Sequence, residues 1–122
     1  QMEVSDDYLD FGTCLVGQTR ELDFQIINMT TSESYWNIYS ENRSNTCDDD
    51  TFKVQPRKGF LEAFVTCTSK RMATVKISFT ATHSDAYDCT FIVQGLLGEY
   101  PRRIVVVGQG SYDGKHETIL EV

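Results

Sequence analysis

Apolar and polar residues alternate in three segments of the chain. In residues 21–26, 75–80 and 87–93 an apolar side chain stands at every second position. A period of two is typical of a β-strand with one buried face. In the third segment Ile92 adds an apolar residue on the outer face, and residues 104–107 are apolar on both faces. The apolar run at residues 104–107 is typical of a central strand or of one covered by a partner.

Shorter strands are predicted at residues 8–11, 35–39 and 51–54, which are rich in β-branched and aromatic side chains. Turn residues such as Gly, Pro, Asn and Asp separate all of these segments. No window has apolar residues at helical spacing over three turns. Short strands joined by polar connections, about seven to eight of them, predict an all-β, immunoglobulin-like antiparallel β-sandwich.

The 122 residues fit a single domain. We expect the sandwich to occupy residues 4–110, followed by a polar tail or linker at residues 111–122. Residues 59–72 fit the pattern least well and could form a strand, a bulged edge or a short helical turn. The opening Gln1-Met2 resembles a junction, so we expect the chain to be a piece of a longer protein. No segment approaches the roughly 18 apolar residues that span a bilayer, so membrane insertion is not expected.

The charge balance is acidic, with 18 Asp and Glu against 11 Lys and Arg and a formal net charge of −7. Such a field repels nucleic acid and anionic lipid, because phosphate binding needs concentrated basic side chains. The basic residues stand mostly in separate pairs and form no run. Two of these pairs, which an acidic segment of a protein partner could bind, supply the candidate partner-binding residues Lys70, Arg71, Arg102 and Arg103. Such pairs are more often solvated loop ends.

Four cysteines allow two interpretations. Cys14, Cys47, Cys67 and Cys89 could form two disulfides in an oxidising compartment, and the triplets at residues 28–30 and 42–44 resemble glycosylation acceptors. Against this, the cysteine spacings are wide and irregular, and a core of this size needs no covalent staple. The sequence therefore favours reduced thiols, which behave as small apolar residues when they are buried.

Catalytic and metal-binding patterns are nearly absent from the sequence. Of two histidines, His83 falls in a predicted turn and His116 in the tail, and no spacing suggests an activated nucleophile. No Cys-x-x-Cys pair suggests zinc. The run Asp48 to Asp50 could hold a hard cation, although it lacks the alternating ligands of a calcium loop and is more typical of a solvated acidic loop. We predict neither an enzyme nor a cofactor or metal site.

The strand pattern carries a family resemblance. Leu9-Asp10-Phe11-Gly12, then Val16-Gly17, then the strand Leu22 to Asn28, resemble the opening of ASH domains, a family within the PapD-like and major-sperm-protein-like sandwiches. Residues 75–82 resemble a later strand of the family, and residues 104–110 resemble its last strand, which closes on Gly-x-Gly. Ala81 stands where the family often has Pro. The motif positions with a structural role would be Phe11, Gly12, Gly17, Asn28, Phe79, Gly108 and Gly110.

Trp36 stands in the predicted strand 35–39, and we interpret it as a core residue because a lone Trp usually fills volume. An immunoglobulin domain would pair this Trp with a disulfide between strands B and F. Cys89 could supply one half of that bond, but residues 22–28 contain no cysteine. This absence argues against a secreted immunoglobulin domain and for a cytosolic PapD-like one.

The resemblance implies a protein-interaction module of a cytoplasmic scaffold in the cytoskeleton, at a centrosome, spindle pole or cilium. Its partners would be centrosomal or ciliary proteins, or neighbouring domains of the same chain. Binding would use an exposed sheet edge or a groove between the sheets. Major-sperm-protein-type domains bind acidic peptide motifs, which the basic pairs could also do.

Two other readings of the sequence stay open. One is a secreted or cell-surface immunoglobulin-like recognition domain with disulfides and glycans. The other is a purely structural spacer in a tandem array of similar domains. Fold-level analogy alone does not decide between them.

Overall fold

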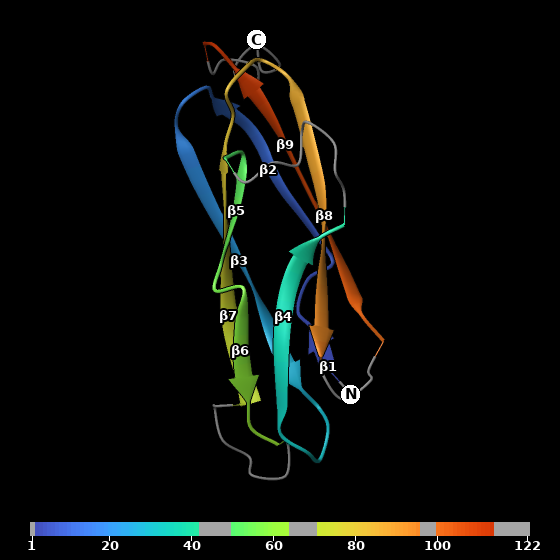
Figure 1. The fold of residues 1–122 in the computed structure, drawn as a ribbon. Coiled ribbons are helices and arrows are strands. Elements are labelled where there is room, and N and C mark those ends of the chain that lie inside the picture. Colours follow the sequence, from blue (N-terminus) through green and yellow to red (C-terminus); the bar gives the residue numbers. More distant parts are fainter. Residues whose placement is uncertain (1, 42–49, 64–70, 96–99, 114–122) are drawn as a thin grey trace.

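The computed structural model describes residues 2–41, 50–63, 71–95 and 100–113. In these ranges nine strands form two sheets that pack face to face as an elongated sandwich (Figure 1). The four-stranded sheet has the order β1-β3-β7-β5, and the five-stranded sheet has the order β2-β9-β8-β4-β6. The strands are β1 (Met2–Val4), β2 (Tyr8–Leu15), β3 (Thr19–Asn28), β4 (Ser34–Ser40), β5 (Phe52–Gln55), β6 (Lys58–Leu61), β7 (Met72–Thr80), β8 (Ala86–Gly95) and β9 (Arg102–Ser111).

The predicted all-β sandwich of two sheets is confirmed, with two differences in detail. The strands number nine instead of seven or eight, because β1 and β6 are short edge strands that the pattern does not single out. One strand pair, β2 with β9, is parallel, whereas all the others are antiparallel. The domain limits 4–110 and the tail 111–122 stay a prediction, and residues 114–122 lie outside the described ranges.

The three alternating segments form β3, β7 and β8, and their apolar rows face the space between the sheets. β3 and β7 pair from Thr19↔Thr80 to Ile27↔Met72. Residues 104–107 lie in β9, which is a central strand between β2 and β8, as predicted. The inner rows are almost fully buried, as in Phe24, Ile26, Val75, Ile77, Phe79, Ile104 and Val106.

An aromatic cluster at the middle of the core surrounds Phe79. Its ring centroid lies 5.1 Å from that of Phe52, 5.4 Å from that of Phe11 and 5.6 Å from that of Tyr87. Gly108 on β9 lies against the same ring, because a Cβ at that position would come within 2.6 Å of the Phe79 side chain. Four positions far apart in the sequence therefore meet in one packed cluster around Phe79.

The remaining motif positions lie at turns and close approaches. Gly12 sits at a bulge of β2 with a φ of 72°, a conformation that favours glycine. Asn28 is buried, and its side-chain amide donates to the carbonyl oxygens of Ser32 and Glu62. The Gly17 N–H donates to the Ala81 carbonyl oxygen at 2.9 Å. Gly110 lies against the same corner, where a Cβ would meet the Ala81 Cβ at 2.7 Å and the His83 backbone carbonyl.

One side of the sandwich is formed by β5 and β6. β5 pairs with β7 in one sheet, and β6 pairs with β4 in the other. The chain passes from one sheet to the other at Gln55-Pro56, a cis peptide bond. Of residues 59–72, the described part that begins the segment belongs to β6 and is therefore a strand without a bulge, the first of the three forms considered for it, while residues 64–70 lie outside the described ranges.

The cysteines differ from the expectation of reduced thiols. Cys89 is disulfide-bonded, so the reduced state favoured by the sequence is wrong for this residue. The inner row of β8 buries Cys89, whereas wide sequence spacing gave no sign that a second cysteine would reach it. Cys14 is a buried thiol outside any disulfide, with its Sγ 3.5 Å from the Phe11 carbonyl oxygen. Cys47 and Cys67 lie outside the described residues. Within the described ranges no helix could cross a bilayer.

Candidate functional site

The two predicted basic residues on β9, Arg102 and Arg103, each form an ion pair within the domain. Arg103 donates from Nε and Nη2 to the two carboxylate oxygens of Glu41, at 3.1 and 2.9 Å. Arg102 donates from Nη2 to Glu3 at 3.0 Å and from Nε to the Met2 carbonyl oxygen at 3.1 Å. Neighbouring residues on a strand point to opposite faces, so the two guanidinium groups serve different sides of the sheet.

The second predicted pair is only partly described. Arg71 precedes β7, and its Nη1 lies 3.8 Å from the Met29 Sδ. Lys70 lies outside the described residues, as do Asp48, Asp49 and His116. His83 is exposed in the turn before β8, with its Nδ1 3.1 Å from the Thr82 hydroxyl. Within the described ranges no group of three or more His, Cys, Asp or Glu side chains could hold a metal ion.

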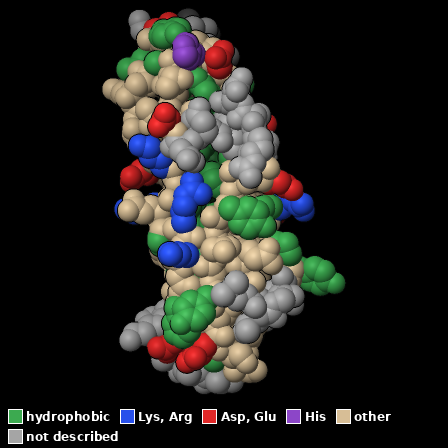
Figure 2. Space-filling view, viewed as in Figure 1, with side chains coloured by type: hydrophobic (Ala, Val, Ile, Leu, Met, Phe, Trp, Pro, Cys, Tyr) green, Lys and Arg blue, Asp and Glu red, His purple; other side chains and the backbone are tan. Residues whose placement is uncertain are grey.

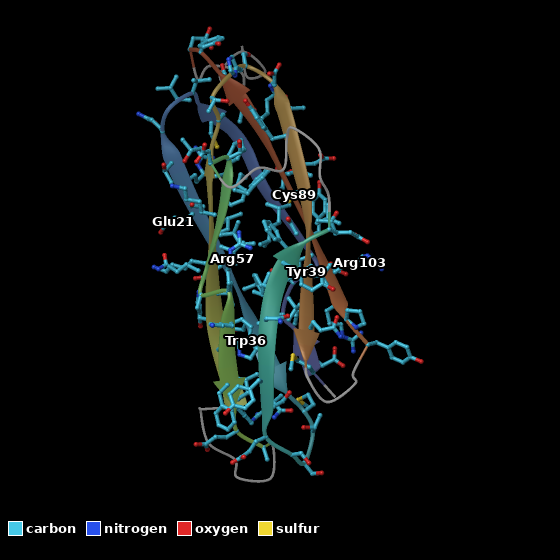
Figure 3. The ribbon with its side chains drawn as sticks, in the orientation of Figure 1. Glu21, Trp36, Tyr39, Arg57, Cys89 and Arg103 are labelled. Carbon is cyan, nitrogen blue, oxygen red and sulfur yellow. The ribbon has the colours of Figure 1, made fainter. Side chains whose placement is uncertain are left out.

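Arg103 and Tyr39 lie on the five-stranded sheet (Figure 3), and Arg103 forms an ion pair with Glu41 there. Ile92, which the sequence places on the outer face of this sheet, is buried between its register partners Tyr39 on β4 and Arg103 on β9. The long Arg side chain can cover an apolar neighbour while its charged head stays in solvent. The hydrogen bond and the positive charge of Arg103 together lower the pKa of the Glu41 carboxyl from its usual value.

We expect the substitution Arg103→Gln to raise the pKa of Glu41 towards its usual value, because the hydrogen bond and charge that stabilise the carboxylate are removed. In the wild type a lowered pKa in the folded state contributes stability above the unfolded-state pKa, and this contribution is lost as the pH falls through the folded-state pKa. NMR titration of the Glu41 carboxyl measures the effect. Arg102→Gln is the matched control, and an unchanged Glu41 pKa in Arg103→Gln would contradict the assignment.

An exposed aromatic pair stands on the outer face of β4 and β6. Tyr35 and Phe60 are register partners, 59% and 44% exposed, with ring centroids 4.9 Å apart. Tyr39 follows on the same face of β4. Cross-strand aromatic pairs stabilise a sheet, but large apolar side chains exposed together are also typical of protein-binding surfaces.

The aromatic pair and Lys58 border a hollow of about 470 Å³ over β4 and β6, lined by Tyr35, Trp36, Asn37, Lys58, Gly59 and Phe60. The Trp36 side chain is 2% exposed, so its predicted core position is confirmed. It lies directly against Gly59, where a Cβ would come within 2.7 Å of the indole. Its buried Nε1 has no hydrogen-bond partner among the described residues. We call Tyr35, Lys58, Gly59 and Phe60 the β6 edge.

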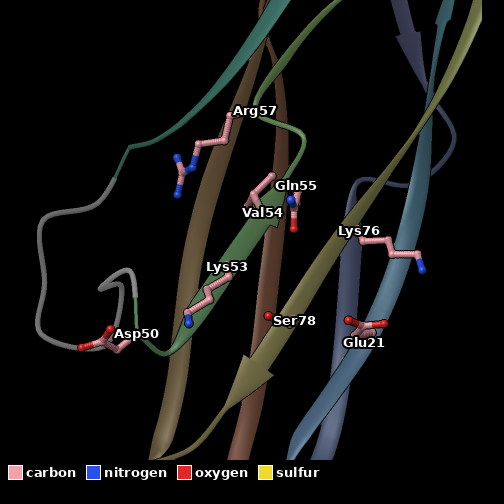
Figure 4. Close-up of a pocket in the computed structure, with 8 residues that line it drawn as sticks. All are labelled: Glu21, Asp50, Lys53, Val54, Gln55, Arg57, Lys76 and Ser78. Carbon is pink, nitrogen blue, oxygen red and sulfur yellow. The ribbon is translucent and has the colours of Figure 1, made fainter.

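Basic side chains gather on the same side of the molecule (Figure 2). Lys53 on β5, Arg57 in the β5–β6 connection and Lys58 on β6 are all exposed. A second hollow of about 580 Å³ lies beside β5 (Figure 4), lined by Glu21, Asp50, Lys53, Val54, Gln55, Arg57, Lys76 and Ser78. Its lining mixes both signs of charge, and so do the surroundings of the β6 edge, where Lys58 lies at one end and Glu33 and Glu62 flank the other.

The β6 edge was not predicted from the sequence. No strand was predicted at residues 58–61 alone, and the predicted strand at residues 35–39 did not tell that Tyr35 points to solvent beside the buried Trp36. The signal that could have found the edge is the alternation of exposed Lys58 and Phe60 with Gly59 and buried Leu61. Four residues are too few for a period of two to stand out.

Comparison with known proteins decides the family. Residues 1–104 match the family described as HYDIN/CFA65/VesB-like, Ig-like domain. The chain belongs to this family. It is also 32% identical over 116 residues to the human protein "Deleted in lung and esophageal cancer protein 1". That match covers 95% of this chain, which spans only 7% of the length of the relative.

Solved structures agree with the predicted ASH/PapD-like fold. The chain is similar to the ASH / PapD-like domain of human CEP192 (PapD-like domain 7), with a TM-score of 0.73, 21% identity and coverage of 90% of this chain and 84% of that one. It also resembles WR4, an MSP family member of C. elegans, with a TM-score of 0.53, 12% identity and coverage of 90% and 97%. The fimbrial chaperone CfaA matches with a TM-score of 0.65, 11% identity and coverage of 91% and 57%. The recognition of an ASH/PapD-like sandwich is confirmed.

Proposed function

We propose that this domain is a non-catalytic protein–protein interaction module of a cytoplasmic, cytoskeletal scaffold at a centrosome, spindle pole or cilium. The observation that carries the proposal is the exposed Tyr35–Phe60 pair, in which Phe60 lies on the edge strand β6 and Tyr35 on its neighbour β4. Monomeric domains rarely leave aromatic rings together in solvent beside an open strand edge without a partner. The compartment rests on the resemblance to ASH domains alone.

Neighbouring domains of the same chain are a further class of partner. The chain spans 7% of a relative that is far longer, and a module within a long protein can bind both its neighbours and other proteins. The proposed partner-binding residues are Lys70, Arg71, Arg102 and Arg103. In the structure Arg102 must release Glu3, and Arg103 must release Glu41, before either can bind another acidic group.

Proximity labelling in ciliated cells, followed by direct binding, tests the proposal. We expect the domain fused to a biotin ligase to label centrosomal or ciliary proteins, and at least one of them to bind the purified domain directly. Phe60→Ala should weaken this binding, and Tyr112→Ala is the matched control, because Tyr112 is an exposed aromatic residue just after the last described strand and its loss should not change binding. If none of the labelled proteins binds the purified domain, the interaction role is wrong.

The second candidate is a secreted or cell-surface recognition domain, which the disulfide at Cys89 favours. The first sequon weighs against it, because Asn28 is fully buried and its amide nitrogen is engaged with Ser32 and Glu62. A glycan on that nitrogen would not fit the folded state. Thiol counting under denaturing, non-reducing conditions and the intact mass of protein purified from its own cells separate the two candidates: four reactive thiols favour the cytoplasmic one, and a glycan or no more than two reactive thiols supports the extracellular one.

A further inference from the structure

We infer that this domain carries tension between its two ends and so serves as a load-bearing link in a scaffold. The inference goes beyond the proposed function, because a domain can transmit force whether or not it binds a partner. It follows from three features of the described chain: the positions of its two ends, the parallel pairing of β2 with β9, and an arginine that ties β1 to β9.

The two ends of the chain lie toward opposite ends of the elongated sandwich (Figure 1). β1 lies beside the start of β9, since the Arg102 side chain contacts Met2 and Glu3. The chain leaves the sandwich after Ser111, at the other end of β9. β9 has ten residues and is therefore roughly 33 Å long. A pull on the two ends therefore acts along the strands instead of across them.

This direction of pull loads the β2–β9 ladder in shear. The two strands are parallel, with register partners from Tyr8↔Val105 to Leu15↔Ser111. Tension pulls β2 from its first residue and β9 from its last, so the strands are drawn past each other and their hydrogen bonds share the load. If the pair were antiparallel, both strands would be pulled from the same end and the bonds would break one after another. Parallel pairing is therefore the arrangement that resists tension.

The same two strands are anchored in the core, so sliding them would expose apolar surface. Leu9 and Phe11 on β2 are 6% and 2% exposed, and Ile104 and Val106 on β9 are fully buried. β9 pairs with β8 along its other side, whereas β2 is the edge strand of the sheet and pairs only with β9 among the described strands. Yielding under tension should therefore begin at β1 and β2, on the N-terminal side.

One side chain reinforces the sandwich where tension enters from the N-terminal side. Arg102 on β9 donates from Nε to the Met2 carbonyl oxygen at 3.1 Å and from Nη2 to Glu3 at 3.0 Å. β1 belongs to the four-stranded sheet and β9 to the five-stranded sheet, so Arg102 joins the two sheets there. β1 pairs with β3 over only three residues. Arg102 therefore strengthens the shortest ladder on the path of the load.

Sandwich topology without any load is the competing explanation of the parallel pair. It accounts for the β2–β9 ladder, but it does not require a side chain that ties β1 to β9. The neighbouring Arg103 makes an equally close ion pair, with Glu41 at 2.9 Å, and Glu41 belongs to neither β1 nor β2. The two arginines therefore allow a contact on the path of the load to be compared with an ion pair outside it.

Single-molecule pulling on the whole chain tests the role of the ladder. Handles are attached at the two chain ends or, in a second geometry, at the N-terminus and at position 100, where an azide-bearing side chain replaces the exposed Tyr100. Position 100 precedes β9, so the second geometry peels β2 from β9 starting at one end. At the same constant load we expect the end-to-end geometry to survive roughly tenfold longer or more, since lifetime under load reports the rate of forced unfolding.

The arginine pair tests the path of the load in the end-to-end geometry. Arg102→Gln should shorten the time to the first extension step roughly fivefold, because it removes a hydrogen bond and an ion pair that hold β1. Arg103→Gln is the matched control, and its time to the first step should stay within about twofold of the wild type because its ion pair lies outside the path.

Two outcomes overturn the inference: equal lifetimes in the two pulling geometries, or equal effects of the two arginine substitutions. Neither bears on the proposed function, which depends on partner binding measured without load. β6 lies at the opposite edge of its sheet from β2, so a domain that fails as a load-bearing link can still bind proteins at the β6 edge. If no labelled protein binds but the end-to-end geometry outlasts the other, the interaction role fails and the load-bearing role stands.

Discussion

Replacement of Phe79 by alanine is expected to lower the free energy of unfolding by about 3–5 kcal/mol. Phe79 is fully buried on β7, and its ring contacts those of Phe11, Phe52 and Tyr87 from both sheets. The substitution removes the centre of this cluster and leaves a cavity that four surrounding strands cannot close. Because domains of this size are stable by about 5–15 kcal/mol in total, the loss would approach global unfolding.

Urea unfolding of the variant and of the wild type measures this loss. Phe60→Ala is the matched control, since it removes the same ring from an exposed position, and its effect should stay within about 1 kcal/mol. A Phe79→Ala protein as stable as Phe60→Ala would mean that Phe79 is not central to the core.

The second large effect is expected at Gly110, where alanine should cost about 3 kcal/mol. A Cβ on Gly110 would overlap the backbone carbonyl of His83 and approach the Ala81 Cβ to 2.7 Å. A backbone group cannot rotate aside as a flexible side chain can, so the corner between β7 and β8 must shift. The Ser84 hydroxyl, which donates to the Gly110 carbonyl oxygen at 3.3 Å, would shift with it.

Gly17→Ala is the matched control for this substitution. Gly17 also belongs to the family motif, but it has open space around it and a φ of 89°. Its replacement by alanine should cost only the strain of a left-handed conformation, roughly 1–2 kcal/mol. Thermal unfolding of the two variants ranks them, and a larger loss for Gly17→Ala would show that close approach at Gly110 is not the cause.

The sequence predicted the strands along which apolar and polar side chains alternate or which are apolar on both faces. A period of two over six or more residues identified β3, β7 and β8, and a run that is apolar on both faces identified β9 as a central strand. These signals depend only on local alternation, which the buried face of a strand imposes on every sequence that folds this way.

The sequence could not predict contacts between distant segments. Arg102 and Arg103 are adjacent in the chain, yet their ion-pair partners Glu3 and Glu41 are 99 and 62 residues away. The pair was therefore interpreted as a solvent-facing or partner-binding feature, whereas each arginine is held within the domain. The Cys89 disulfide was missed for the same reason, because proximity of two cysteines depends on topology and not on spacing.

The β6 edge illustrates a second limit. Alternation tells which side chains share a face, but it does not tell which strand ends a sheet. Lys58 and Phe60 stand together at an exposed edge only because β6 is the last strand of its sheet and Tyr35 lies beside it on β4. β6 lies at the edge because the chain passes to the other sheet after β5. No local pattern of four residues predicts that passage.

Amide hydrogen exchange at Lys58 and Phe60 tests most directly whether the domain binds proteins through this edge. The account predicts that both N–H groups exchange more slowly when a labelled partner protein saturates the domain, since a bound protein shields the edge strand, while the amides of β2 on the opposite edge keep their rates. Unchanged exchange at Lys58 and Phe60 in the saturated complex would contradict binding at the β6 edge.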